Sequence, residues 1–262
     1  MTALLDQLVG LTGRVAVVTG AASGYGQASA QLLAKCGLRV AACDIDGTAL
    51  SRAAAELSQP EKHLAITADI GSVQDCERLV SKVLDAFGRL DILVNAAAVL
   101  KSTAIEDVDE ALWNKTLDVN LKGPYFLARA ASRPMRAAKW GRIVNFVSTA
   151  GVTGGTSGVS VYGISKAGVI TMTRSLARAF GRDNVLVNAI SPASLRTPLF
   201  RRNMTEAELA KVSDDYQRAS LFGRWTEPEE VARSVLYLCS EMSSCVTGQL
   251  LHADSGADVV NP

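Results

Sequence analysis

Short β-branched runs alternate with longer amphipathic runs along almost the whole chain, and no other feature of the sequence restricts the fold as strongly. Several short runs are apolar throughout, such as VAVVTG and RIVNFVS, which is typical of strands covered on both faces. Strands are predicted at residues 14–20, 39–44, 63–69, 92–97, 142–148, 185–191 and 250–254, and helices at 26–36, 48–57, 72–87, 109–131, 160–180 and 228–240. The alternation predicts an α/β fold, a Rossmann-type doubly wound sheet of seven mainly parallel strands flanked by helices.

No linker or low-complexity segment interrupts the chain, so residues 1–262 are expected to form a single domain. The stretch 193–225 departs from clean periodicity and mixes apolar with charged residues. Because long irregular segments in compact domains often cover binding sites, this stretch is predicted to form a lid over the substrate. Three of its arginines, Arg196, Arg201 and Arg202, meet either an anionic group or solvent, and the sequence leaves both possibilities open.

The charge balance and the cysteine content exclude several classes of protein. Twenty-seven basic and 26 acidic side chains leave a formal net charge of +1, which predicts no nucleic-acid or membrane partner. The first ten residues lack the positive region of a signal peptide, and no apolar run approaches the roughly 20 residues of a membrane span. Five cysteines without a CxxC pair and only two histidines fit reduced thiols and no metal site. We therefore expect a cytoplasmic protein.

A glycine-rich turn, TGAASGYG at residues 19–26, follows the first predicted strand and opens a helix. Such a turn lets backbone N–H groups approach a pyrophosphate, to which the positive end of the helix dipole is also attracted. The sequence thus predicts a dinucleotide site, with contacts from the turn residues Gly20, Ser23, Gly24, Tyr25 and Gly26.

The cofactor type is predicted from Asp44, which closes the second strand and is placed to accept hydrogen bonds from the adenosine ribose hydroxyls. A carboxylate there repels a 2′-phosphate, no basic residue stands beside it, and Ser23 occupies the position where a basic residue would favour the phosphorylated cofactor. NAD is therefore predicted rather than NADP.

Two further strand ends carry polar residues with two interpretations each. Asp69 either bonds the adenine or acts as an N-cap-like acid for the following helix, and Asn95 either braces the sheet or contacts the cofactor. Their neighbours and that of Asp44 are included in the predicted cofactor site, namely Ile45, Ile70, Ala96 and Ala97.

Tyr162 and Lys166 lie four residues apart and so share one face of a predicted helix. A phenol with a pKa of about 10 is a poor base at neutral pH. A cation one turn away, together with the positive nicotinamide of an oxidised cofactor, would stabilise the phenolate. The glycine-rich stretch 151–158 follows the fifth strand and places Tyr162 near the strand ends, where ligands bind in open α/β sheets.

Two more polar residues complete the predicted proton-handling group. Ser148 ends the fifth strand and can hydrogen-bond a substrate oxygen, with Thr149 as a rival donor. Asn120 lies in a predicted helix close to Pro124, where a break in the hydrogen-bond ladder would free its backbone carbonyl for a water; a tolerated polar residue is the alternative.

Together these residues resemble the short-chain dehydrogenase/reductase family over nearly the whole chain. The family pattern TGxxxGxG falls on residues 19–26, its NNAG segment on 95–98, and its C-terminal signature on 247–249 and 254–256. The resemblance implies four catalytic residues, Asn120, Ser148, Tyr162 and Lys166, and nicotinamide contacts from Pro192, Leu195 and Thr197. It also implies a homotetramer built through the long fourth and fifth helices and the last strand.

The sequence departs from the family pattern at three places. Tyr25 replaces a small aliphatic residue, so an aromatic ring must be accommodated near the cofactor, NNAG becomes NAAA, and the PG turn becomes Pro192-Ala193. None of these changes removes a proton-handling group.

The resemblance implies an NAD-dependent oxidoreductase that interconverts a secondary alcohol and a ketone by hydride transfer. Tyr162 would act as general acid and base, Ser148 would bond the substrate oxygen, Lys166 would hold the ribose and lower the pKa of the phenol, and Asn120 would anchor a water. The alternatives are an NADPH-dependent ketoreductase of the 3-oxoacyl type and a non-catalytic nucleotide-binding regulator. Steroid, cyclic alcohol, hydroxy acid and sugar substrates remain open.

Overall fold

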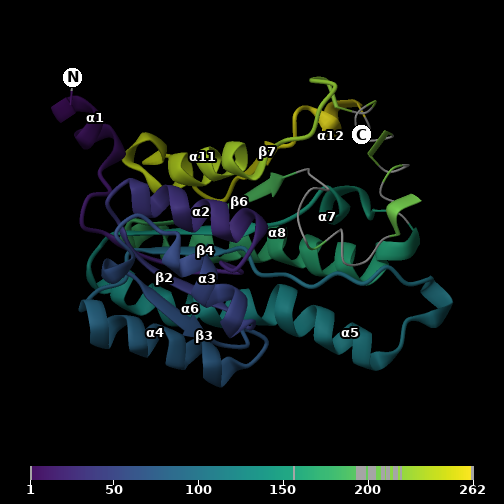
Figure 1. The fold of residues 1–262 in the computed structure, drawn as a ribbon, viewed down its shortest axis with the longest axis horizontal. Coiled ribbons are helices and arrows are strands. Elements are labelled where there is room, and N and C mark those ends of the chain that lie inside the picture. Colours follow the sequence, from purple (N-terminus) through teal and green to yellow (C-terminus); the bar gives the residue numbers. More distant parts are fainter. Residues whose placement is uncertain are drawn as a thin grey trace.

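The computed structural model describes residues 2–155, 157–192 and 220–260, with residues 199, 205–207, 210, 213–214 and 218 between them. Its sheet has seven strands in the order β3-β2-β1-β4-β5-β6-β7, and every neighbouring pair is parallel. The strands are β1 Val15–Thr19, β2 Arg39–Asp44, β3 Leu64–Thr67, β4 Ile92–Asn95, β5 Gly141–Phe146, β6 Val185–Pro192 and β7 Leu250–Ala253 (Figure 1). The α/β prediction is confirmed, and the sheet is parallel throughout.

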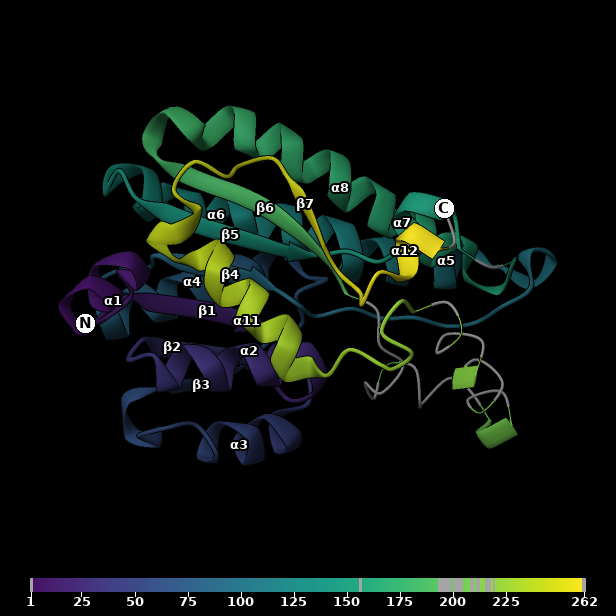
Figure 2. The ribbon, with the colours of Figure 1, turned by 90° about the horizontal axis from the view of Figure 1, so that it is seen from above.

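Helices cover both faces of the sheet, as the view from above shows (Figure 2). Those on one face are α2 Gly24–Lys35, α3 Gly47–Ala55 and α11 Pro228–Cys239, and those on the other are α4 Val73–Phe87, α6 Gly123–Ala137 and α8 Ser160–Phe180. Shorter helices are α1 Thr2–Val9, α5 Glu110–Leu117, α7 Ala150–Thr153 and α12 Ala257–Val260. The N-terminal helix α1 was not predicted.

The central strand β1 shows why its sequence is apolar throughout. Val15 and Val17 are buried against α4, α6 and α8, whereas Ala16 and Val18 are buried against α2 and α11. Since successive side chains of a strand point to opposite faces, a strand between two helical layers needs apolar residues at every position.

The helix predicted at 109–131 is interrupted in the structure, at the place where Asn120 and Pro124 indicated a possible break. The chain instead forms α5, a π-helical turn at Asp118–Lys122, and α6, which runs to Ala137. A Cβ at Gly123 would lie 2.3 Å from the Ile70 carbonyl oxygen, and Pro124 has no N–H to donate. The close approach of the Ile70 backbone to Gly123 therefore accompanies a change from α-helical to π-helical hydrogen bonding.

At the amino ends of the strands, the guanidinium groups of Arg14 and Arg142 lie 3.6 and 4.3 Å from the ring centre of Trp140. Arg142 is buried and its Nη2 lies 3.5 Å from Glu241, while Arg14 pairs with Asp91 at 3.0 Å. This cluster of cations, ring and carboxylates joins the starts of β1, β4 and β5.

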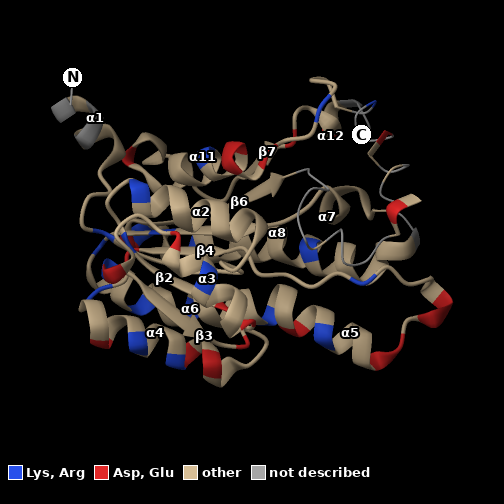
Figure 3. Cartoon of the chain, viewed as in Figure 1, with Lys and Arg blue, Asp and Glu red and all other residues tan. Residues whose placement is uncertain are grey.

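Acidic and basic residues are intermixed on the helices, as on α4 and α5 (Figure 3), which agrees with the near-neutral net charge. Among the described residues, no helix has both the length and the apolar character that crossing a bilayer requires.

Candidate active site

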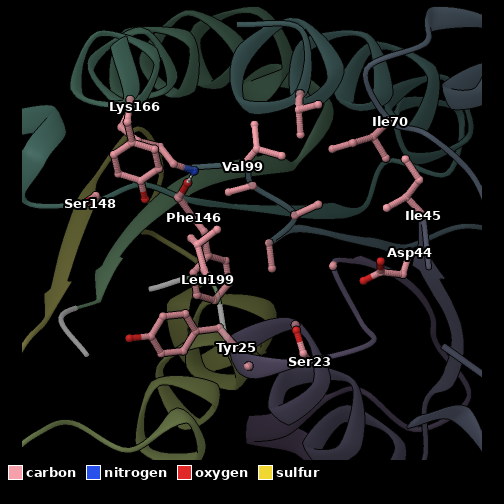
Figure 4. A pocket seen from close by; sticks show the side chains of 18 of the residues that line it. Ser23, Tyr25, Asp44, Ile45, Ile70, Val99, Phe146, Ser148, Lys166 and Leu199 are labelled. Atoms are coloured by element: carbon pink, nitrogen blue, oxygen red, sulfur yellow. Dashed lines mark hydrogen bonds between the residues drawn. The ribbon is translucent and has the colours of Figure 1, made fainter. Parts of the chain in front are cut away.

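A cavity of about 540 Å³ lies at the carboxyl ends of the strands, next to the turn between β1 and α2. The predicted site residues that line it are Gly20, Ser23, Gly24, Tyr25, Gly26, Asp44, Ile45, Asp69, Ile70, Ala96, Ala97, Ser148, Tyr162, Lys166 and Pro192. Figure 4 shows Asp44 and Ile45 at one end of this cavity and Ser148 and Lys166 at the other. Segments far apart in sequence thus contribute to one elongated site.

The glycines of the turn lie so close to neighbouring backbone that a larger residue would not fit. Gly20 and Gly24 adopt left-handed φ values of 68° and 56°, and a Cβ at Gly20 would lie 2.8 Å from the backbone of Ala97. A Cβ at Gly26 would lie 2.2 Å from the Gly20 carbonyl oxygen. Ser23 is the N-cap of α2 but makes no side-chain cap hydrogen bond, so this helix end fits an external anion such as a pyrophosphate.

The carboxylate of Asp44 is fixed beside this turn, at the end of the cavity away from Ser148 and Lys166. Its Oδ2 accepts a hydrogen bond from the Ala22 N–H at 3.1 Å, and its Oδ1 accepts one from the Asp46 N–H at 3.1 Å. Each oxygen keeps a further lone pair for a ribose hydroxyl. The residues present therefore fit the pyrophosphate and ribose of a dinucleotide.

Asp69 also lines the cavity, and the cap of the following helix is a different residue. Ser72 accepts the capping hydrogen bond from the Asp75 N–H at 3.3 Å. Asp69 Oδ1 accepts from the Gly71 N–H at 2.9 Å, and its Oδ2 lies 3.3 Å from Lys115 Nζ. The interpretation of Asp69 as a helix N-cap is wrong.

The proton-handling residues are assembled at the far end of the cavity. Tyr162 and Lys166 are both buried on α8, and Lys166 Nζ lies 5.7 Å from the centre of the Tyr162 ring. Lys166 Nζ donates a hydrogen bond to the Phe146 carbonyl oxygen at 2.8 Å. Ser148 lines the cavity together with Tyr162, and its hydroxyl accepts a hydrogen bond from the Ala150 N–H at 3.2 Å.

Burial sets the protonation of this pair. It raises the pKa of Tyr162 to about 12, against a smaller lowering by the hydrogen bond to Ser148, and it lowers the pKa of Lys166 to about 8. The protein's own groups thus raise the pKa of the Tyr162 phenol, because desolvation outweighs the lowering by Ser148. The expectation that Lys166 together with an oxidised nicotinamide lowers this pKa stays a prediction.

Asn120 does not line the cavity, but its side chain joins two of its walls. Its Oδ1 accepts a hydrogen bond from the Val99 N–H at 2.8 Å, and its Nδ2 donates to the Val99 carbonyl oxygen at 2.9 Å and to Ser165 Oγ at 3.1 Å. Ser165 Oγ in turn donates to the Tyr162 carbonyl oxygen at 2.7 Å. The predicted break in the helix at Asn120 is present as the π-helical turn.

Asn95 is buried away from the cavity lining and braces the sheet. Its Nδ2 donates to Asn145 Oδ1 at 2.9 Å, and Asn145 Nδ2 donates to Thr173 Oγ1 of α8 at 3.0 Å. Of the two interpretations of Asn95, bracing is the one that the contacts support, whereas Ala96 and Ala97, which are also predicted cofactor residues, line the cavity. The N–H groups of these two alanines are held by Thr19 Oγ1 at 3.1 and 3.2 Å.

Several lining residues were not predicted. Most of them are sequence neighbours of a predicted residue, so a wider selection at each strand end would have included them. Lys115 lies on α5, away from the predicted residues in sequence, and no sequence pattern indicated it. The unpredicted residues are Cys43, Ala68, Ala98, Val99, Lys115, Val119, Phe146, Val147 and Leu199, and the rival donor Thr149 also lines the cavity. The predicted contacts Leu195 and Thr197 and most of the predicted lid 193–225 lie outside the described residues.

This chain is similar to known proteins over nearly its whole length. The profile of a family described as enoyl-(acyl carrier protein) reductase matches residues 20–258. The NAD-dependent glycerol dehydrogenase of Listeria innocua is 37% identical over 251 residues, which are 96% of each chain. The 3-oxoacyl-[acyl-carrier-protein] reductase FabG of Aquifex aeolicus is 33% identical over 248 residues, 94% of this chain and 98% of that one.

A crystal structure of a putative short-chain alcohol dehydrogenase from Sinorhizobium meliloti superimposes with a TM-score of 0.89 at 32% identity, covering 95% of this chain and 97% of that one. The fold and the site define an NAD(P)-dependent oxidoreductase that acts on CH–OH groups. The chain belongs to the short-chain dehydrogenase/reductase family.

Proposed function

We propose that this protein is an NAD-dependent dehydrogenase that interconverts a secondary alcohol and a ketone. The observation that carries the proposal is that Tyr162, Ser148 and Lys166 line the same cavity as the fixed carboxylate of Asp44, with Lys166 one helical turn from Tyr162. Residues 1–262 act as one catalytic unit, in which the substrate meets Tyr162 and Ser148.

Asp44 supports NAD as the cofactor. The described basic residues that line the cavity are Lys115, which pairs with Asp69, and Lys166, which lies beside Tyr162. A 2′-phosphate at Asp44 would therefore meet a fixed negative charge, with no unpaired cation beside it among the described residues that line the cavity. The Listeria relative is itself named as NAD-dependent.

In the proposed reaction, Tyr162 takes the proton of the substrate alcohol while Ser148 holds the same oxygen in place. When bound, NAD⁺ supplies the acceptor for the hydride of the carbinol carbon. Lys166 holds the nicotinamide ribose, and its charge with that of the nicotinamide lowers the pKa of the Tyr162 phenol. The backbone carbonyl of Asn120 anchors a water through which the proton reaches solvent.

The remaining cofactor contacts follow the lining of the cavity. The α2 N-terminus with Gly20, Ser23 and Gly24 takes the pyrophosphate, and Asp44, Ile45, Asp69 and Ile70 take the adenosine. Pro192 with Leu195 and Thr197 contacts the nicotinamide.

The test is a panel of secondary alcohols assayed with NAD⁺ and with NADP⁺, following reduced nicotinamide by its absorbance. We expect turnover of at least one alcohol and a higher kcat/KM with NAD⁺. Turnover with NADP⁺ alone contradicts the cofactor assignment, and the absence of turnover and of nucleotide binding contradicts the whole proposal.

The second candidate is an NADPH-dependent ketoreductase of the 3-oxoacyl type, which the similarity to the Aquifex enzyme favours. Reduction of a 3-oxoacyl thioester with NADPH, at a higher kcat/KM than any alcohol oxidation with NAD⁺, would establish it. A non-catalytic regulator is disfavoured because Tyr162, Ser148 and Lys166 all line the same cavity.

We further propose that the protein is cytoplasmic and assembles as a homotetramer through α6, α8 and β7. Light scattering coupled to gel filtration measures the mass of the assembly, for which four times 27.6 kDa is expected.

A further inference from the structure

Two stacked aromatic rings form part of the cavity wall at its catalytic end. The rings of Tyr25 and Phe146 have centroids 5.6 Å apart and planes inclined by 22°. Tyr25 is the second residue of α2, within the glycine turn, and Phe146 is the last residue of β5, two positions before Ser148. Both line the cavity, and Figure 4 shows them together on the side opposite Lys166.

The pair lies between the two halves of the proposed cofactor site. Tyr25 belongs to the turn that fits the pyrophosphate, and the Phe146 carbonyl oxygen accepts the hydrogen bond of Lys166. The Phe146 ring is 5% exposed and packs into the core between the sheet and the helices α2 and α11, where it supports the Tyr25 ring. A dinucleotide that reaches from the turn to Tyr162 must therefore pass its nicotinamide half along these rings.

The charges that line the cavity are unevenly distributed. Its described acidic residues, Asp44 and Asp69, come from the ends of β2 and β3 at the adenosine end. The described ionisable groups at the catalytic end are the cation Lys166 and the phenols of Tyr25 and Tyr162, and burial raises the pKa of Tyr162. A pyridinium placed there meets no carboxylate among the described lining residues, and the negative faces of aromatic rings are the groups that attract a cation.

We propose that the Tyr25–Phe146 pair sets the preference of this enzyme for the redox state of its cofactor. The rings stabilise the positively charged oxidised nicotinamide over the neutral reduced one, which favours oxidation of the alcohol. The inference rests on the proposed function, since it assumes that a nicotinamide dinucleotide occupies the cavity, and it assigns a role to Tyr25 beyond packing.

Binding measurements test it without turnover. Dissociation constants of NAD⁺, NADH and ADP-ribose are measured by calorimetry for the wild type, Tyr25→Phe, Tyr25→Leu and Phe146→Leu. Tyr25→Phe keeps the aromatic face, so we expect its ratio of NAD⁺ to NADH affinity to stay within about twofold of the wild-type ratio. Tyr25→Leu and Phe146→Leu are expected to weaken NAD⁺ binding by roughly 2- to 30-fold and NADH binding by less.

ADP-ribose, which lacks the nicotinamide, reports on the turn and on folding, and its affinity is expected to stay unchanged in Tyr25→Leu. A matched control is Ile45→Ala at the adenosine end, which is expected to weaken all three ligands by the same factor. Equal weakening of NAD⁺ and NADH in Tyr25→Leu, or no change in either, overturns the inference while leaving the proposed function intact. If the wild type binds neither NAD nor NADP, the proposed function itself fails.

Discussion

Asn120 Nδ2 donates a hydrogen bond to Ser165 Oγ at 3.1 Å, and this contact ties the π-helical turn to the helix that carries Tyr162. The same amide pairs with both backbone groups of Val99. One fully buried side chain thus holds a cavity wall, a helix junction and the general acid–base helix in register.

Replacing Asn120 by Leu should lower both stability and activity. The change leaves the half-buried Val99 N–H and carbonyl groups without the Asn120 side chain, at a cost of up to roughly 1–3 kcal/mol for each group left unsatisfied. Urea denaturation measures the loss, and kcat is expected to fall more than KM rises. Ser165→Ala is the matched control, since Asn120 then keeps both bonds to Val99 and the loss should be smaller. Equal losses in the two variants would contradict this role of Asn120.

Tyr162→Phe should keep the affinity for NAD⁺ and lose most turnover. The variant removes only the phenol hydroxyl, and general acid–base groups typically contribute roughly 10²- to 10⁴-fold to the rate. Calorimetry measures the binding and single-turnover kinetics the rate. Unchanged turnover would remove Tyr162 from the mechanism.

Asp44→Asn should raise the ratio of kcat/KM for NADP⁺ to that for NAD⁺ by roughly 10- to 100-fold, because a neutral amide no longer repels a 2′-phosphate. The neighbouring Asp46 offers a control, since it caps α3 through the Ala49 N–H and does not line the cavity. Asn caps helices as well as Asp does, so Asp46→Asn should leave the ratio unchanged. A rise in the Asp46→Asn ratio comparable to that in the Asp44→Asn ratio would indicate a general charge effect.

Lys166 makes the stability of the protein depend on pH in an unusual direction. Burial lowers its pKa from 10.5 to about 8, so between these values the unfolded chain binds a proton that the folded protein does not. The free energy of unfolding contributed by this group therefore rises with pH across that window, and below about pH 8 the full desolvation penalty applies.

Lys166→Met, which keeps the length and removes the charge, should abolish that rise. The difference in free energy of unfolding between variant and wild type is measured at several values between pH 7 and pH 10.5. Taking the difference cancels the titration of the buried cysteines and of Tyr162, provided that they titrate alike in both proteins. A difference that does not vary with pH would show that Lys166 is not desolvated as described.

The sequence predicts those features that depend on neighbouring residues. The limits of β2, the shared helix face of Tyr162 and Lys166, and the glycine turn all follow from local periodicity and spacing. The sequence does not predict contacts between segments that are distant along the chain. The π-helical turn depends on the approach of Ile70 to Gly123, and periodicity within residues 109–131 carries no trace of that approach.

Tyr25 illustrates the same limit within the candidate site. Its departure from the family pattern was visible in the sequence, but its ring partner lies in β5, and no spacing rule relates the two residues. Likewise, spacing suggested that Lys166 acts on the phenol, whereas the sign of the protein's own effect on the Tyr162 pKa depends on burial.

The cation and ring cluster of Arg14, Trp140 and Arg142 lies at the edge of the sheet away from the cavity. The contacts of this cluster thus connect the strands at their amino ends, whereas the residues proposed for catalysis lie at their carboxyl ends. Because of this separation, substitutions around the cavity that change which alcohol is accepted would leave the contacts of this cluster intact.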